Sequence, residues 1–149
     1  MPTPNRRYSS KNFKRLEIKM GFVFYNPNPK GLFTSDCVIR AISKLLNLSW
    51  DETYLNLAMW GFDRKSIISS DDVWCDYLKS HGFTMGVVPD TCPDCYTVRQ
   101  FAADNPVGKY LLKIPGHSAG HVVAVVDGNY YDTWDCGSSY PIYYLGRDY

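Results

Sequence analysis

Apolar positions divide the chain into a helical part followed by a strand-rich part. In several segments between residues 35 and 104, apolar residues recur every three or four positions, the period of a helix with one buried face. From Lys109 onward, short runs of β-branched and aromatic residues are separated by turn residues, a pattern typical of strands. Helices first and strands after predict an α+β domain with a C-terminal antiparallel sheet.

Four helices are expected. Ser35 is a favourable N-cap for the first helix, whose apolar stripe is the clearest in the chain. The stripe comprises Cys37, Val38, Ala41, Ile42, Leu45 and Leu46. Ser49 opens a second helix with a capping box, and that helix is expected to end near Gly61. A third helix is expected over residues 70–80, and a short fourth opens at Thr97.

Strands are expected on both sides of these helices. They cover residues 16–25, 110–114, 121–126, 130–135 and 141–145. Asp127-Gly128 predicts a two-residue hairpin turn, because both positions of such a turn need positive φ. The expected organisation is a flexible basic arm over residues 1–15, followed by a single domain over residues 16–149.

Composition and charge narrow the class of protein. The 149 residues are 45% hydrophobic and 21% charged with a net charge of +1, as in a soluble globular protein. No apolar run approaches the roughly 20 residues of a membrane helix, and the N-terminus has no apolar signal-type segment. We therefore expect a cytoplasmic protein without membrane binding. The basic arm could touch nucleic acid or another acidic partner, but near-neutral charge makes a solvated tail the favoured interpretation.

Cys37 is the strongest candidate for a reactive thiol. It alone of the five cysteines lies in the first turn of a predicted helix, where unpaired N–H groups and the helix dipole lower the pKa of a thiol. Cys75 lies within a helix beside core positions, and Cys136 follows a strand with no helix behind it. The alternative for Cys37 is a packed side chain in the apolar stripe.

A nucleophilic thiol needs a histidine base and a third group that orients the histidine. His121 opens the hydrophobic strand over residues 121–126, which would hold a base rigidly. The alternative is a hydrogen-bonded structural histidine at a strand end. His117, in a flexible loop, and His81, after a helix, are weaker candidates.

The hairpin indicates which acid accompanies His121. With Asp127-Gly128 as the two turn residues, side-chain alternation places Asp132 on the face of His121 as its diagonal neighbour. A three-residue turn would reverse this parity and bring Asp135 opposite His121. We favour Asp132 because Asp-Gly favours the shorter turn. Either carboxylate could instead cap or solubilise the strand end.

These residues together resemble the papain-like cysteine peptidases, which place a Cys at a helix start, then a His at a strand start, then an acid or amide on the next strand. Asp36-Cys37 followed by Ala41 resembles the bacteriocin-processing (double-glycine) branch, as does Gly120-His121 followed by valines. Asp132-Thr133-Trp134 is similar to the Asn-Ser-Trp element that supplies papain's third residue. Parts of the chain also resemble small uncharacterised proteins of phages and gut bacteria.

The resemblance covers roughly residues 25–146 and implies a papain-like fold, with the nucleophile helix packed on the C-terminal sheet. One position departs from the family: the Gln that donates to the oxyanion, about six residues before the Cys, is Gly31 here. The backbone N–H of Cys37 is one remaining donor, and the side-chain amide of Asn28 is the candidate for the other, with Asn26 as an alternative. Both asparagines could instead only fix turns of a proline-rich loop.

Cys92-Pro93-Asp94-Cys95 is a single pair of cysteines of the C-x-x-C type. A structural zinc site would need a second pair, and none exists at the usual spacing. A thioredoxin-like motif would open a helix after a strand. We expect an incidental loop, with zinc binding, redox work or a disulfide as alternatives.

The function expected from these observations is a cysteine-dependent peptidase or isopeptidase that forms an acyl-enzyme on Cys37 and acts on a protein or peptide substrate. Neither a metal nor a cofactor is expected. The alternatives are a catalytically inactive binding module of phage or bacterial origin, and an acyl or amide transferase that uses the same thiol. If phage-encoded, the protein would act in the cytoplasm of the host.

Overall fold

The computed structural model describes residues 21–116 and 120–148. The predicted basic arm over residues 1–15 and the loop residue His117 lie outside the described residues. The helices are α2 (Cys37–Leu46), α3 (Trp50–Arg64), α4 (Asp71–Ser80) and α5 (Val98–Asp104). The strands are β1 (Phe22–Phe24), β2 (Thr84–Val87), β3 (Lys109–Ile114), β4 (His121–Val126), β5 (Asn129–Asp132) and β6 (Tyr143–Arg147). The mixed α+β class predicted from the sequence is confirmed.

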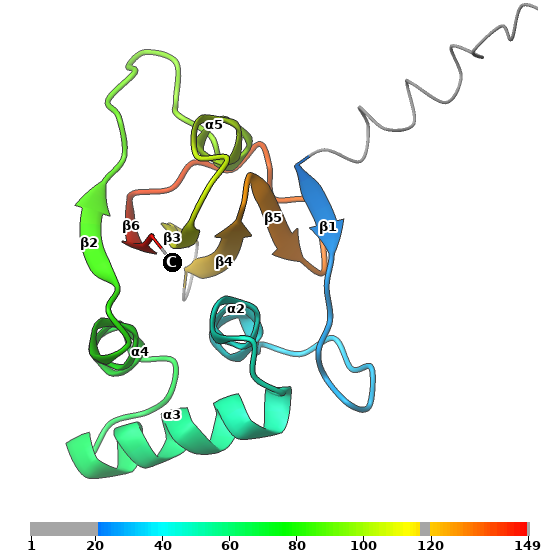
Figure 1. The fold of residues 1–149 in the computed structure, drawn as a ribbon, viewed down its shortest axis with the longest axis vertical. Coiled ribbons are helices and arrows are strands. Elements are labelled where there is room, and N and C mark those ends of the chain that lie inside the picture. Colours follow the sequence, from blue (N-terminus) through cyan, green and yellow to red (C-terminus); the bar gives the residue numbers. More distant parts are fainter. Residues whose placement is uncertain (1–20, 117–119, 149) are drawn as a thin grey trace, which may run out of the picture.

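The strands form one sheet in the order β1-β5-β4-β3-β6-β2 (Figure 1). All neighbouring pairs are antiparallel except β1 and β5, which run parallel. The predicted antiparallel pairing is confirmed for the C-terminal strands β3 to β6, and the parallel pair involves β1, the strand that precedes the helices. The reason is that β1 precedes all the helices, so the chain returns to it only after crossing the molecule, and a crossover connection allows parallel pairing.

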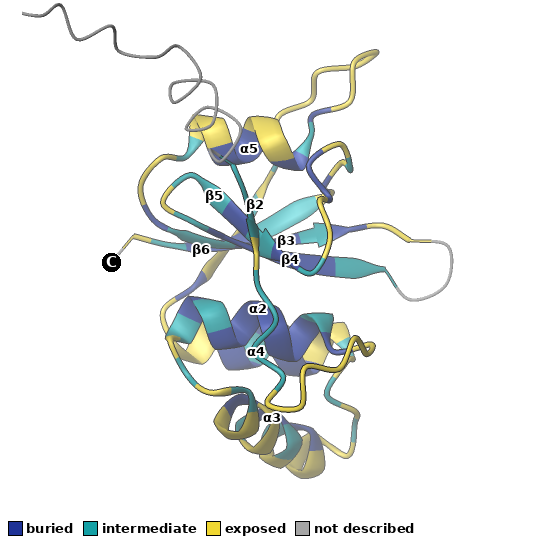
Figure 2. Cartoon of the chain, turned by 90° about the vertical axis from the view of Figure 1, so that its right-hand side faces the viewer, coloured by how far each residue is buried: buried dark blue, intermediate teal, exposed yellow. Residues whose placement is uncertain are grey.

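Helices cover both faces of the sheet. Figure 2 shows α2, α3 and α4 on one side and α5 on the other. This arrangement explains why β4 is an uninterrupted hydrophobic run: Val122 and Ala124 enter the core on the side of α2, whereas Val123 and Val125 enter the core on the side of α5. β4 is consequently a strand fixed by packing on both faces.

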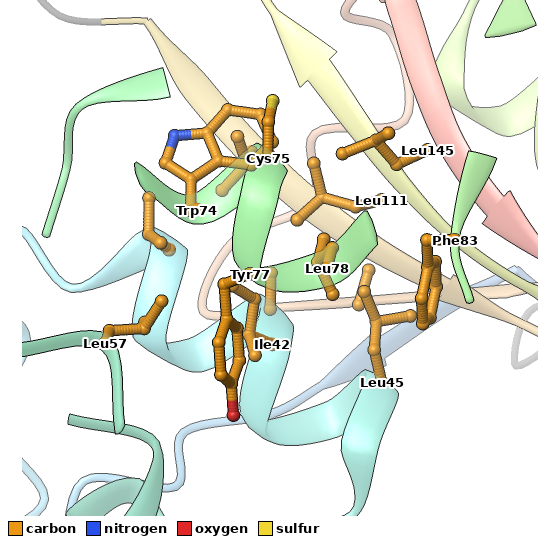
Figure 3. Close-up of a cluster of buried hydrophobic side chains, with 14 of the residues drawn as sticks. Ile42, Leu45, Leu57, Trp74, Cys75, Tyr77, Leu78, Phe83, Leu111 and Leu145 are labelled. Carbon is orange, nitrogen blue, oxygen red and sulfur yellow. The ribbon is translucent and has the colours of Figure 1, made fainter. Parts of the chain in front are cut away.

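The core between α2, α4 and the sheet holds the first helix in place. Side chains of α4 point toward Ile42 and Leu45 of α2 and toward Leu111 and Leu145 of the sheet (Figure 3). Cys75 is buried within this cluster, as its position beside core residues predicted. The cluster positions α2 across the strand that begins with His121.

Capping explains where the helices begin. Ser49 accepts a hydrogen bond from the N–H of Glu52 at the start of α3, which is one half of the predicted capping box, whereas Thr97 and Gln100 form a complete capping box at the start of α5. Two boundaries were wrong. α3 continues past Gly61 to Arg64, and the N-cap of α2 is Asp36 instead of Ser35. The carboxylate of Asp36 does not cap the helix and instead accepts hydrogen bonds from Arg40 and Trp50.

The hairpin turn has the predicted length. Asp127 and Gly128 have φ of 50° and 81°, and Val126 pairs with Asn129 across the turn. Strand β5 ends at Asp132, three residues earlier than expected. Strand β2 was not predicted, because its sequence Thr-Met-Gly-Val is short and mostly exposed, so it lacks a continuous apolar signal. None of the described helices is long and apolar enough to cross a bilayer.

Helix α3 allows a matched test of this packing. Leu57 is fully buried, so Leu57→Ala should lower the free energy of unfolding by about 2–5 kcal/mol through the cavity it leaves. Leu55, on the same helix, is 62% exposed, and Leu55→Ala should change the free energy by less than about 0.5 kcal/mol. Urea denaturation measures both values. Equal losses in the two variants would contradict this orientation of α3.

Candidate active site

Packing of α2 against β4 brings Cys37 and His121 together. Each is the first residue of its element, and each is partly buried. The thiol of Cys37 hydrogen-bonds to the imidazole of His121 and also receives a main-chain hydrogen bond from Val122. The two residues lie 84 positions apart in the sequence, and the α2–β4 packing alone makes them neighbours.

Asp132 completes a line of three side chains. Its Oδ2 lies 2.5 Å from Nε2 of His121, and its side chain is fully buried at the end of β5. This contact agrees with the parity argued from the two-residue turn. Asp135, the alternative acid, lies elsewhere: it accepts hydrogen bonds from the hydroxyl of Tyr130 at 2.5 Å and from the N–H of Gly137. With Nε2 engaged by Asp132, the other ring nitrogen of His121 is left for the thiol.

A buried ion network lies behind Asp132. Arg40 donates from Nη1 to Oδ1 of Asp36 at 2.5 Å and from Nη2 to Oδ1 of Asp132 at 3.0 Å. Asp36 also accepts a hydrogen bond from Nε1 of Trp50 at 2.9 Å. Sequence reasoning missed Arg40. The available signal was the spacing of Asp36 and Arg40, four residues apart on one helix and embedded in apolar neighbours.

The surroundings of Cys37 favour its thiolate. Burial on its own would raise the pKa of the Cys37 thiol. The hydrogen bond from His121 and that from Val122, with the positive charges of His121 and Arg40, outweigh burial and lower the pKa below that of an ordinary cysteine.

His121 and Asp132 shift in the complementary directions. Burial opposes protonation of His121, but hydrogen bonds with Asp132, Cys136 and Cys37 and the charge of Asp132 raise its pKa to about 11. Burial likewise opposes ionisation of Asp132, whereas His121, Arg40 and the N–H of Thr133 lower its pKa overall. The surroundings of both groups therefore favour a thiolate on Cys37 paired with an imidazolium on His121.

Cys136 is a further residue of this cluster that the sequence did not place there. Its side chain is fully buried and hydrogen-bonds to His121, and burial raises the pKa of its thiol. Ligand atoms of His121, Asp132 and Cys136 lie within 4.8 Å of one another, which is close enough for the three residues to share a metal ion. The carboxylate of Asp132, however, already accepts hydrogen bonds from Arg40, from the N–H of Thr133 and from His121. The positive guanidinium of Arg40 would also repel a metal cation. These donors fit a hydrogen-bonded network better than a metal centre.

Asn28 is not brought to the thiol. Its side-chain oxygen accepts a hydrogen bond from the N–H of Lys30 at 2.9 Å, and its own N–H donates to Asn26. Neither of the cavities that Cys37 lines includes Asn28. The asparagines fix turns of their loop, so the proposed oxyanion role of Asn28 lacks support.

The start of α2 offers oxyanion donors of its own. The first N–H groups of a helix have no acceptor within the helix, and the side chain of the N-cap, Asp36, does not cap them. Its two oxygens are instead engaged by Arg40 and Trp50. The first main-chain N–H groups of α2, beginning with that of Cys37, thus remain available to a negative charge that develops beside the sulfur.

Two cavities meet at Cys37. The apolar cavity, of about 540 Å³, lies between the start of α2, helix α3 and residues 66–69. Its apolar walls include Val38, Tyr54, Ala58, Phe62 and Ile67. The imidazole-side cavity, of about 610 Å³, is lined by His121, Gly120, Trp134 and other residues on the sheet side of the thiol. A chain bound across both cavities would pass directly over the sulfur.

Cys92 and Cys95 lie apart from this site. Both are exposed, free thiols in the segment between β2 and α5. Within residues 21–116 and 120–148, one group of potential ligand residues is close enough to share a metal ion. It consists of His121, Asp132 and Cys136, so neither Cys92 nor Cys95 belongs to it.

Comparisons with protein-family models, with curated proteins and with solved structures give no match for this chain. A function is therefore inferred from the geometry of its own residues.

The lowered pKa of Cys37 predicts selective alkylation. Iodoacetamide reacts with the thiolate, so the rate at Cys37 should reach half its maximum below pH ~8.5, the pKa of a free cysteine. His121→Ala should move that midpoint upward, because the hydrogen bond and positive charge are both lost. Mass spectrometry of native protein labelled across a pH series provides the measurement.

Cys92 is the internal control for this experiment. It is exposed, but its hydrogen bond to Asp90 raises the pKa of its thiol, so accessibility alone should not make it react at low pH. Equal labelling of Cys37 and Cys92 at every pH would contradict an activated Cys37.

Proposed function

We propose that this chain is a papain-like thiol hydrolase that cleaves a peptide or isopeptide bond through an acyl-enzyme on Cys37. The observation that supports the proposal most strongly is the unbroken line Cys37–His121–Asp132, with the thiol at an uncapped helix start. A thiolate, a cationic base and an orienting carboxylate in this order are the requirements of nucleophilic acyl transfer.

The residues divide the reaction among them. The Cys37 thiolate attacks the carbonyl carbon, forming a C–S bond and an oxyanion that the N–H groups at the start of α2 stabilise. His121 then donates its proton to the leaving amine as the C–N bond breaks. In the second half, His121 takes a proton from water, hydroxide attacks the thioester, and the acid leaves as the thiolate is restored. Asp132 holds the imidazole in one orientation throughout.

The position of His121 supports a specific placement of the two halves of a substrate in the two cavities. The leaving amine must be on the side of the imidazole that protonates it, which is the imidazole-side cavity. The acyl half remains bonded to the sulfur and extends the other way, into the apolar cavity. Since that wall carries Tyr54, Phe62 and Ile67, the fitting acyl half has a large apolar side chain near the scissile bond.

Substitution of the three residues tests hydrolysis directly. Cleavage of an internally quenched peptide library should be abolished in Cys37→Ser and reduced about 10²–10⁴-fold in kcat/KM in His121→Ala, because general acid–base catalysis is lost. Cys75→Ser, a buried thiol outside the site, is the matched control and should retain activity.

The same assay separates the competing functions. Acyl-enzyme that forms on Cys37 but yields amide only when an amine is added would indicate a transferase. Absence of any acyl-enzyme with activated peptide esters, in a folded protein, would indicate a binding module and refute the hydrolase.

The assignment of the apolar cavity predicts a change in specificity. Ala58→Trp should narrow the cavity, so kcat/KM should fall at least about tenfold for peptides with Leu or Phe on the acyl side and stay unchanged for those with Gly. Met59→Trp is the control, since Met59 is 66% exposed on the same helix and does not line the cavity. Loss of activity toward both kinds of peptide, or toward neither, would argue against this binding mode.

A further inference from the structure

We propose that Arg40 is a positioning residue for the reactive pair: it holds the carboxylate of Asp132 with Oδ2 turned toward His121 and so keeps the imidazole in line with the thiol of Cys37. The inference deepens the proposed function and rests on it for its catalytic meaning. Its geometric part can be tested without any substrate.

The contacts of Asp132 assign a separate task to each carboxylate oxygen. Oδ1 receives Nη2 of Arg40 at 3.0 Å and the N–H of Thr133 at 2.7 Å, whereas Oδ2 is 2.5 Å from Nε2 of His121. The Thr133 amide alone fixes one direction, but a carboxylate on a single donor can still rotate. The second donor, on a planar guanidinium, removes that freedom.

Arg40 is itself held from behind. Arg40 is 4% exposed and binds Asp36 through the other terminal nitrogen at 2.5 Å, and Asp36 in turn accepts a hydrogen bond from Trp50. A buried guanidinium with a carboxylate on each side has little room to move. The orientation of Asp132 is thus determined by α2 and α3, elements that Asp132 does not belong to.

The positive charge of Arg40 favours the ionised forms of Asp132 and Cys37, in addition to the effect of its hydrogen bonds on the orientation of Asp132. Asp36 and Asp132 are both buried, and the guanidinium of Arg40 lies between their carboxylates. The positive charge of Arg40 lowers the pKa of Asp132 and also that of Cys37, which lies three positions before it on α2. The groups that face the imidazole are Asp132, Cys37 and Cys136, and the burial-raised pKa of Cys136 keeps that thiol neutral.

An ion pair that served only to hold α2 on the sheet would affect Cys37 through its charge alone, so a variant that keeps the charge would leave the reactivity of Cys37 unchanged. The test is therefore the pH dependence of Cys37 alkylation by iodoacetamide, followed by mass spectrometry. Arg40→Met should raise the midpoint by more than about half a pH unit, because it removes both a charge that lowers the pKa of Cys37 and a donor that holds the carboxylate of Asp132. Arg40→Lys keeps the positive charge but loses the planar guanidinium that binds both aspartates, so we expect a smaller upward shift of the midpoint, by about half a pH unit.

Arg64→Met is the matched control. Arg64 also pairs with an aspartate, Asp76, but both side chains are partly exposed and neither lines the two cavities. Its midpoint should equal that of the wild type. Circular dichroism establishes which variants fold; if Arg40→Met does not, Arg40→Lys carries the test, because it leaves neither aspartate without a cation.

The outcomes separate this inference from the proposed function. A raised midpoint in the Arg40 variants, with wild-type protein that cleaves no peptide, would support the positioning role and refute the hydrolase. A midpoint in folded Arg40→Lys equal to that of the wild type would overturn the positioning role, even if peptides are cleaved. In an active enzyme, Arg40→Lys should lower kcat at least about fivefold with KM unchanged, and an effect on KM alone would also overturn the inference.

Discussion

The buried ion pair between Arg40 and Asp132 is the constraint on which the arrangement of the site depends. It joins the helix that carries Cys37 to the strand next to the one that carries His121. Removing both ions from water costs several kcal/mol each, so such a pair is retained only with good geometry and with its remaining donors and acceptors satisfied. Asp36, Trp50 and the N–H of Thr133 supply those contacts. A small relative shift of α2 and β5 would break this network and the alignment of Asp132 with His121 together.

Along this network the charges alternate in sign. Asp36 and Asp132 are on either side of Arg40, and His121 separates Asp132 from the thiolate of Cys37. Each ion is therefore next to at least one of opposite sign, although most of the line is buried. The same arrangement leaves the start of α2 without a side-chain cap, because the carboxylate of its N-cap is committed to Arg40 and Trp50. The engagement of Asp36 by Arg40 thus both pairs the buried guanidinium and leaves the N–H groups at the start of α2 available beside the sulfur.

Local patterns were sufficient for most elements and for three side chains of the site. Capping residues and apolar stripes placed the four helices of the described residues, and the Asp127-Gly128 turn fixed the parity that brings Asp132 to His121. These features depend on neighbours in sequence. The pairing of Arg40 with Asp132 could not be found in the same way, because the two residues are 92 positions apart and a hydropathy pattern assigns every arginine to the surface. The parallel pairing of β1, the edge strand β2 and the approach of Cys136 to His121 are likewise set by the path of the chain in space.

The hairpin turn makes chain length, more than residue identity, the property to which the site is most sensitive. Inserting or deleting one residue between β4 and β5 would leave the apolar strand buried on both faces, since its valines fill both cores equally well. The same change would turn Asp132 away from the imidazole, because alternation along β5 reverses with the register. A chain with one residue more or fewer in this turn would therefore keep the fold but lose the contact between Asp132 and His121, even with every side chain of the site present.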